Sequence, residues 1–140
     1  MGLRRKAREC ALQMLYEVDM TEADPRQVLQ AYWSENRVPD SVRRYADRLL
    51  IGAGENQKAI DQRIEARSTN WRLERMGRVD RNILRMGVYE LLFEPETPHR
   101  VVINEAIEIA KKYGSEDAAQ FVNGILDAIR KDRDGAALER

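Results

Sequence analysis

The chain has 140 residues, of which 43% are hydrophobic and 34% charged, and its 24 Lys and Arg balance its 24 Asp and Glu. This length and composition fit one globular domain with a core and exclude a disordered chain, while the balanced charge leaves the choice of partner to local charge clusters. The single Cys and single His exclude a disulfide framework, a CxxC site and most catalytic constellations. We therefore expect a protein that is not an enzyme and has neither a metal nor a cofactor. No apolar run reaches the roughly 18 residues of a membrane span, and no apolar segment follows the basic N-terminus, so we expect a cytoplasmic protein.

The first predicted helix, residues 3–20, is amphipathic, and Cys10 lies on its core stripe. Four positive charges crowd into five residues near its start, outside the stripe: Arg4, Arg5, Lys6 and Arg8, here called the basic cluster. Leu12 and Tyr16 lie one turn apart on the side away from the stripe. A basic cluster beside an exposed apolar pair indicates a surface that a partner covers. The alternative is that the basic cluster only solubilises the helix end.

Two further helices are expected before a polar break. Asp24 has N-cap chemistry and Pro25 fits the first helical position of the second helix. The third helix begins at Asp40 or Ser41. We expect it to continue to about residue 66 through Gly52 and Gly54, although each glycine weakens a helix by up to about 1 kcal/mol.

The central helix, residues 79–92, organises the second half of the chain. It follows the polar segment 68–70, which we take as the boundary between two sub-bundles, and a short helix at 71–76. Its apolar residues cover most of the helix circumference, which places it in the middle of a core. One polar ridge runs along it at every fourth position, and we expect this ridge in solvent: Arg81, Arg85 and Tyr89.

Two helices complete the prediction. The prolines in residues 94–98 indicate a loop, and a helix begins at Val101 or Val102 and stops at Gly114. Residues 115–117 have N-cap chemistry for a last helix, and the tail 132–140 carries no core signal and is expected to fray. The chain is therefore predicted to be all-α, with about seven helices in a single domain over residues 1–140. Its sub-bundles span about 1–67 and 71–131.

Two more features could carry chemistry. Phe121 lies at the edge of the last core stripe, where its ring could stack on a base while Asp117 or Gln120 reads the base edge. The alternative is core packing of the ring and simple capping by Asp117. Glu74 and Asp80 flank the start of the central helix, where the helix dipole favours acids. They either cap the helix or, together with Tyr16, dock a basic partner protein.

Four segments, in this order and spacing, resemble the NusB family of transcription antitermination proteins: RRKARECALQMLYE, VDRNILRMGVYELL, INEAIEIAKKYG and FVNGILD. They cover roughly residues 4–17 and 71–127. The resemblance implies an all-helical fold of two perpendicular three-helix bundles. It also implies binding of boxA-type RNA in ribosomal RNA precursors, jointly with the small-subunit ribosomal protein NusE, within an antitermination complex on RNA polymerase.

The resemblance also implies roles for particular residues. One set matches the RNA-binding positions of the family: Arg4, Arg5, Lys6, Arg8, Asp117, Gln120 and Phe121. Another set matches positions that face NusE: Tyr16, Glu74 and Asp80. Gly87 departs from the family, since a small residue such as Ala is expected there; glycine should relax the central helix but permit close packing.

Some relatives form homodimers, and the pair of Leu12 and Tyr16 would permit one here. Two alternatives stand beside an RNA-binding adaptor. One is an RNA-recognition module like that of RNA cytosine methyltransferases, although 140 residues leave no room for the methyltransferase domain. The other is a purely structural helical dimer.

Overall fold

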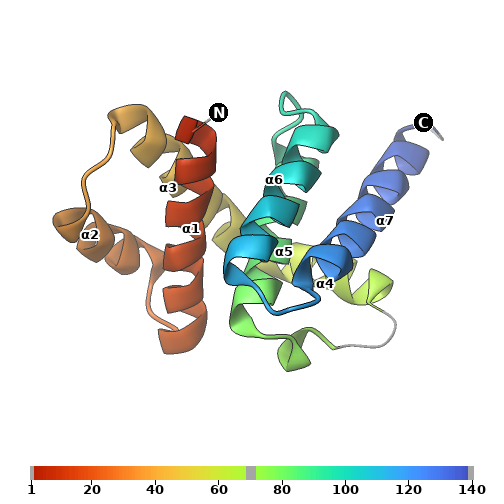
Figure 1. Ribbon diagram of the computed structural model, residues 1–140, viewed down its shortest axis with the longest axis horizontal. Helices are drawn as coiled ribbons and strands as arrows, with labels where there is room; N and C mark the ends of the chain where they lie inside the picture. Colours follow the sequence, from red (N-terminus) through yellow and green to blue (C-terminus); the bar gives the residue numbers. More distant parts are fainter. Residues whose placement is uncertain (1, 69–71, 139–140) are drawn as a thin grey trace. The chain divides into compact units, whose positions relative to one another are not determined.

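The computed structural model describes residues 2–68 and 72–138, and every regular element within these two ranges is helical (Figure 1). The described residues form seven α-helices and one short 3-10 helix, and the chain divides into two compact units, Met1–Glu55 and Asn56–Arg140. The prediction of an all-α chain with about seven helices is confirmed. Residues 69–71, which hold most of the expected boundary and the start of the short helix at 71–76, lie outside the described residues.

Unit 1 consists of α1 (Gly2–Thr21), α2 (Pro25–Glu35) and α3 (Asp40–Glu55). α1 packs against both of the other helices, and Cys10 is buried on its core stripe, as its position in the sequence predicts. The N-cap prediction for α2 is also confirmed, because Asp24 Oδ1 accepts a hydrogen bond of 2.9 Å from the backbone N–H of Arg26.

The expected continuity of the third helix is wrong. α3 ends at Glu55, Asn56 has φ −111° and ψ 15°, and α4 (Gln57–Arg67) begins at the next residue. The Asn56 carbonyl still accepts the N–H of Ile60 at 2.9 Å. Gly and Asn are both weak helix formers, and Gly54 and Asn56 fall together at this point, so the helix stops here rather than bending through it. The two units meet in the sequence at this break and not near residue 68.

Unit 2 contains α4, the 3-10 helix η1 (Leu73–Arg75), α5 (Arg78–Phe93), α6 (His99–Tyr113) and α7 (Ala118–Leu138). α5 packs against α4, α6 and α7, and most of its apolar side chains are buried, which confirms its predicted place in the core. Val79 and Leu92 are half-buried, and Phe93, at the end of the helix, is 42% exposed. Gly87 permits a close approach of α7, because a Cβ at this position would lie 2.8 Å from Leu126 Cδ1.

The polar ridge of α5 is not in solvent. Arg85 and Tyr89 are each 7% exposed, and Arg81 is half-buried. Arg85 Nε donates to Asp61 Oδ1 at 2.8 Å and Nη2 donates to Oδ2 at 3.0 Å, so α4 supplies a carboxylate for the guanidinium. The Tyr89 hydroxyl donates to Glu94 Oε2 at 2.9 Å. The expectation of exposure was wrong because polar periodicity does not show that another segment brings partners to these side chains.

The tail is helical as far as Leu138, which contradicts the expected fraying from residue 132. Arg133 Nη1 donates to the Leu91 carbonyl at 2.9 Å, and Asp132 forms a two-pronged ion pair with Arg67 of α4. Within α7, Arg130 also pairs with Asp127 at 2.7 Å. The tail carries no core stripe in its sequence, and these polar contacts with α4 and α5 hold it against the rest of unit 2.

Candidate nucleic-acid interface

The basic cluster occupies the first two turns of α1, and the structure divides it. Arg4 and Lys6 are exposed, Arg5 is half-buried and Arg8 is only 2% exposed. We expected four charges on one exposed surface, and Arg8 is not part of that surface. It lies on the same side of the helix as Arg4, one turn further on, where the helix packs against α3.

Tyr45 of α3 lies beneath this side of the cluster. The guanidinium carbon of Arg4 is 3.7 Å from the centroid of the Tyr45 ring, and that of Arg8 is 5.8 Å away. The first distance is a close cation–π contact. It holds the exposed Arg4 side chain in a defined place, and the guanidinium keeps its positive charge. The sequence placed Tyr45 on the inner face of α3 but gave no sign that arginines would cover its ring.

The predicted exposed pair of α1 is also divided. Leu12 is 5% exposed, whereas Tyr16 is half-buried. The expectation is wrong for Leu12, because α1 is packed on more than one side and buries an apolar residue outside its main stripe. Tyr16 alone keeps a partly accessible apolar surface here.

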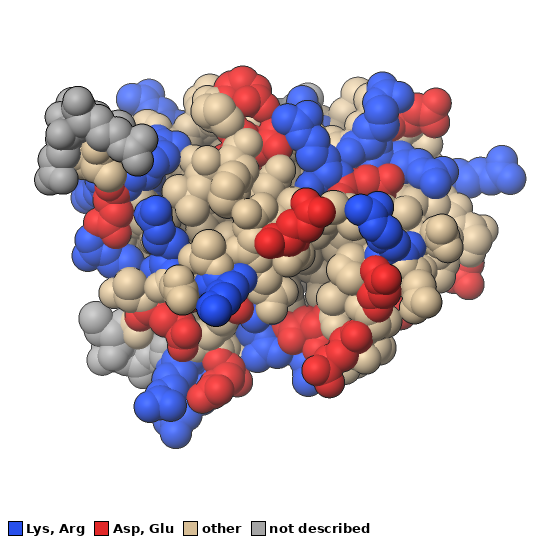
Figure 2. Space-filling view, turned by 180° about the vertical axis from the view of Figure 1, so that it is seen from behind, with Lys and Arg blue, Asp and Glu red and all other residues tan. Residues whose placement is uncertain are grey.

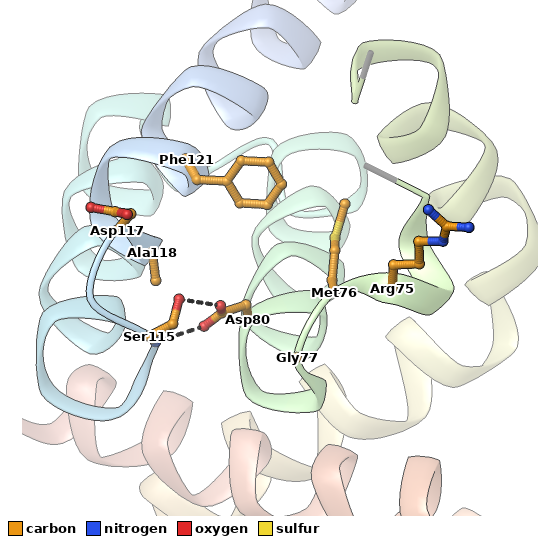
Figure 3. A pocket seen from close by; sticks show the side chains of 8 residues that line it. All are labelled: Arg75, Met76, Gly77, Asp80, Ser115, Asp117, Ala118 and Phe121. Carbon is orange, nitrogen blue, oxygen red and sulfur yellow. Dashed lines mark hydrogen bonds between the residues drawn. The ribbon is translucent and has the colours of Figure 1, made fainter. Parts of the chain in front are cut away.

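In unit 2, a pocket of about 350 Å³ opens where the chain enters α5 and α7 (Figure 3). Its walls come from the segment before α5, the first turn of α5 and the first turns of α7: Arg75, Met76, Gly77, Asp80, Ser115, Asp117, Ala118 and Phe121. The ring of Phe121 and the side chain of Met76 extend over the pocket from opposite walls. Phe121 is half-buried and Asp117 exposed, so the pocket joins an accessible ring to a charged rim.

The turn between α6 and α7 forms one side of the pocket and is tied to α5. Ser115 donates two hydrogen bonds to the Asp80 carboxylate, from its backbone N–H to Oδ1 at 3.2 Å and from Oγ to Oδ2 at 2.7 Å. The Ser115 side chain therefore binds α5, although we expected it to cap α7. Gly114 ends α6 in an extended conformation, with φ −84° and ψ −178°, so it is not the left-handed stop of a typical C′ glycine.

Gln120 and Glu74 lie at the surface, whereas Asp80 is buried. Gln120 is exposed on the first turn of α7, and Glu74 is exposed in η1. Glu74 lies 3.7 Å from Arg72, but both side chains are about three-quarters exposed (76% for Arg72 and 74% for Glu74), so solvent screens this pair strongly. Asp80 is 9% exposed. The structure thus brings Asp80, expected to face a protein, into the same pocket as Asp117 and Phe121, expected to face RNA.

Within residues 2–68 and 72–138, no group of three or more His, Cys, Asp or Glu side chains could hold a metal ion. None of the helices described has the length and apolar character needed to cross a membrane. Charges of both signs are interspersed with uncharged side chains on the face drawn in Figure 2.

Comparison with known proteins places the chain in a family. The family model described as the NusB family matches residues 5–131. The chain is 52% identical to the transcription antitermination protein NusB of Trichlorobacter lovleyi, covering 92% of this chain and 91% of that protein. It is 48% identical to the protein of the same name from Sorangium cellulosum, covering 96% and 99%. A solved structure of the antitermination factors NusB and NusE in complex with double-stranded RNA contains a chain that is 34% identical, with a TM-score of 0.84 and coverage of 94% and 98%.

The fold and these similarities define an all-helical, non-enzymatic transcription factor. More particularly, the chain belongs to the NusB family of transcription antitermination proteins.

Proposed function

We propose that this protein binds boxA-type RNA of ribosomal RNA precursors together with NusE and thereby nucleates an antitermination complex on RNA polymerase. The observation that carries this proposal is the similarity, over nearly the whole chain, to the protein solved in complex with NusE and double-stranded RNA. The exposed arginine held on the Tyr45 ring and the aromatic pocket of unit 2 support it, since both suit RNA. Because such a complex forms on RNA polymerase, we also propose that the protein acts in the cytoplasm.

The basic cluster is proposed to contact phosphates. Arg4 and Lys6 are exposed and Arg5 is half-buried, so these side chains can reach a phosphate, and Arg can bind one with two parallel hydrogen bonds. Arg8 is buried and would not touch a phosphate itself. It would add positive potential to the surface, and its guanidinium lies near the same Tyr45 ring as that of Arg4.

The pocket of unit 2 is proposed to contact a base. Phe121 offers a half-buried ring on which an unstacked base can lie, and stacking of this kind is worth about 1–3 kcal/mol per base. Gln120 and Asp117 are exposed beside that ring and carry donors or acceptors for a base edge. A carboxylate repels phosphate, so base contact is the role that suits Asp117.

NusE is proposed to bind where Tyr16 and Glu74 are accessible. Glu74 is exposed in η1 and only weakly engaged by Arg72, so a basic side chain of a partner protein can displace that arginine. Tyr16 can add apolar contact area and a hydroxyl. The same face of α1 could pair two copies of the chain; sedimentation with and without NusE would show whether such a homodimer forms and whether NusE dissociates it.

Gel-shift titrations with boxA-type RNA and NusE, added singly and together, test the proposal. We expect the boxA-type RNA to bind better than a scrambled RNA and NusE to strengthen that binding. In the double variant Arg4→Ala, Arg5→Ala, all RNAs should bind more weakly, and the slope of log K against log salt should flatten by about one unit for each phosphate that the variant no longer neutralises.

Arg37→Ala is a single-charge control, because it removes one exposed positive charge of unit 1 outside the basic cluster. It should leave the salt slope almost unchanged. The proposal fails if boxA-type RNA binds no better than the scrambled RNA even with NusE present. An unchanged salt slope in the double variant would remove the basic cluster from the interface.

A further inference from the structure

Asp80 has both of its carboxylate oxygens engaged by a single residue of another helix–helix connection. Oδ1 accepts the Ser115 backbone N–H at 3.2 Å and Oδ2 accepts the Ser115 hydroxyl at 2.7 Å, and Figure 3 shows both bonds at the base of the pocket. Asp80 is 9% exposed, so water competes little for these oxygens. Hydrogen bonds to an ionised acceptor are about twice as strong as neutral ones.

The packing around this pair leaves little room for it to move. A Cβ at Gly114 would lie 2.8 Å from Asp80 Oδ1 and 2.8 Å from the Ala110 carbonyl oxygen. Such distances are shorter than van der Waals contact, so only glycine lets the turn come this close to the carboxylate. The two hydrogen bonds of Ser115 and the lack of a side chain at Gly114 therefore both hold the start of the turn between α6 and α7 in place.

Ser115 also contacts the first turn of α7. Its carbonyl accepts the N–H of Ala118 at 3.0 Å, while its own N–H and hydroxyl are given to Asp80. Two residues later, the Asp117 carbonyl accepts the N–H of Phe121 at 3.2 Å. Ser115 is therefore bonded both to the first turn of α5 and to the first residue of α7, and Asp117 and Phe121 lie in the same turn of backbone as that residue.

We infer that Asp80 and Ser115 are positioning residues that hold Asp117 and Phe121 in the geometry needed to select a base. This inference rests on the proposed role of the pocket in RNA binding. It gives Asp80 a task different from offering a free carboxylate to a protein partner. The carboxylate acts within its own chain, and its effect on RNA passes through the turn at Ser115.

The test uses the full-length chain and measures the ratio of affinities for boxA-type and scrambled RNA, together with the affinity for NusE. Ser115→Ala removes the hydroxyl bond but leaves the Asp80 carboxylate in place. We expect the affinity ratio to fall by about 3- to 10-fold, the effect of losing one hydrogen bond. The affinity for scrambled RNA, the salt slope and the affinity for NusE should not change, because the basic cluster and the exposed acid of η1 are untouched.

Three further variants complete the design. Ser115→Thr keeps a hydroxyl and should retain the ratio, and Asp80→Asn, which cannot accept both bonds, should lower it as Ser115→Ala does. Ser34→Ala is the matched control, because this exposed serine donates only locally, to the Ala31 carbonyl at 2.6 Å. Hydrogen exchange should accelerate at the amides of residues 114–118 in the Ser115→Ala and Asp80→Asn proteins and nowhere else in unit 2.

The variant Phe121→Ala distinguishes the proposed role of the pocket in base binding from the positioning role of Asp80 and Ser115. If this variant leaves the affinity ratio unchanged, the pocket does not read a base and the proposed role of the pocket fails. If Phe121→Ala lowers the ratio while Ser115→Ala and Asp80→Asn do not, only the positioning inference is overturned. A loss of NusE binding in Asp80→Asn with an unchanged RNA ratio would likewise overturn it, because Asp80 would then serve the protein partner directly.

Discussion

Replacing Asp61 by Ala should destabilise unit 2 far more than removing an equivalent acid at the surface. Asp61 accepts two hydrogen bonds from Arg85, at 2.8 and 3.0 Å, and in this pair the Arg85 side chain is 9% exposed and the Asp61 side chain 20%. Breaking a buried ion pair from one side costs about 3–5 kcal/mol, because the remaining charge stays buried without its partner. Arg85 keeps its hydrogen bond from Nη1 to Asn82 Oδ1 at 3.3 Å, and the partial exposure of Asp61 lets water approach the guanidinium, so we expect a value near the lower end, about 3 kcal/mol.

Asp132→Ala is the matched control. Asp132 also forms a two-pronged ion pair with an arginine, but the side chains are 45% exposed for Arg67 and 36% for Asp132. Ion pairs this exposed contribute little, so the control should show only a small fraction of the destabilisation of Asp61→Ala. Both substitutions introduce Ala inside a helix, so the gain in helix propensity largely cancels between them.

Urea and thermal denaturation, both followed by far-ultraviolet circular dichroism, measure the stability of both variants. We expect a lower midpoint for Asp61→Ala with an unchanged m-value, and a melting temperature lower by about 10 °C for a chain of this size. Equal destabilisation of the two variants would refute the reasoning, since it would mean that burial of the Arg85 guanidinium does not set the cost.

The remaining predictions concern a tight turn, acid stability and the basic cluster. Gly114→Ala should cost about 1–3 kcal/mol in urea denaturation, since the new Cβ would lie 2.7–2.8 Å from three neighbouring atoms, whereas Gly124→Ala, with open space around it, should stabilise α7 by up to about 1 kcal/mol. The hydrogen bond from Arg67 lowers the pKa of Asp132 below its ordinary value of 3.8. The pair therefore stabilises the folded state above that pH, and this stabilisation is lost as the pH falls further. Asp132→Asn should flatten this part of the pH profile of the urea midpoint. Tyr45→Leu removes the ring beneath Arg4 and should weaken all RNAs alike by about 2- to 5-fold in gel shifts; a change in sequence preference without a change in affinity would contradict this.

The sequence predicted the helices well because amphipathic periodicity and N-cap chemistry are local. The N-cap at Asp24 and the largely buried α5 are examples, and both are confirmed. Contacts between segments far apart in the chain leave no such pattern. Arg85 alternates with apolar residues like any surface arginine, and only the fold shows that Asp61 lies beside it.

The candidate site shows the same division. The basic cluster and the aromatic Phe121 stand out by residue type, and the sequence singled out both. Neither the Tyr45 ring under Arg4 nor the bond between Ser115 and Asp80 could be predicted, because each joins two segments that are far apart in the sequence and come together only in the fold. The ends of helices were also hard to predict. The break at Asn56 depends on a small difference in helix propensity, too small for the sequence alone to show whether the helix ends there.

The ordered tail of α7 has a consequence for the pocket at the helix's other end. Asp132 is bound to α4, and Arg133 is bound to the Leu91 carbonyl of α5, about 17 Å along the helix axis from Phe121. A continuous helix cannot rotate at one end alone. These two polar contacts at the C-terminal end therefore also restrict rotation, about the helix axis, of the turn of α7 that carries Phe121.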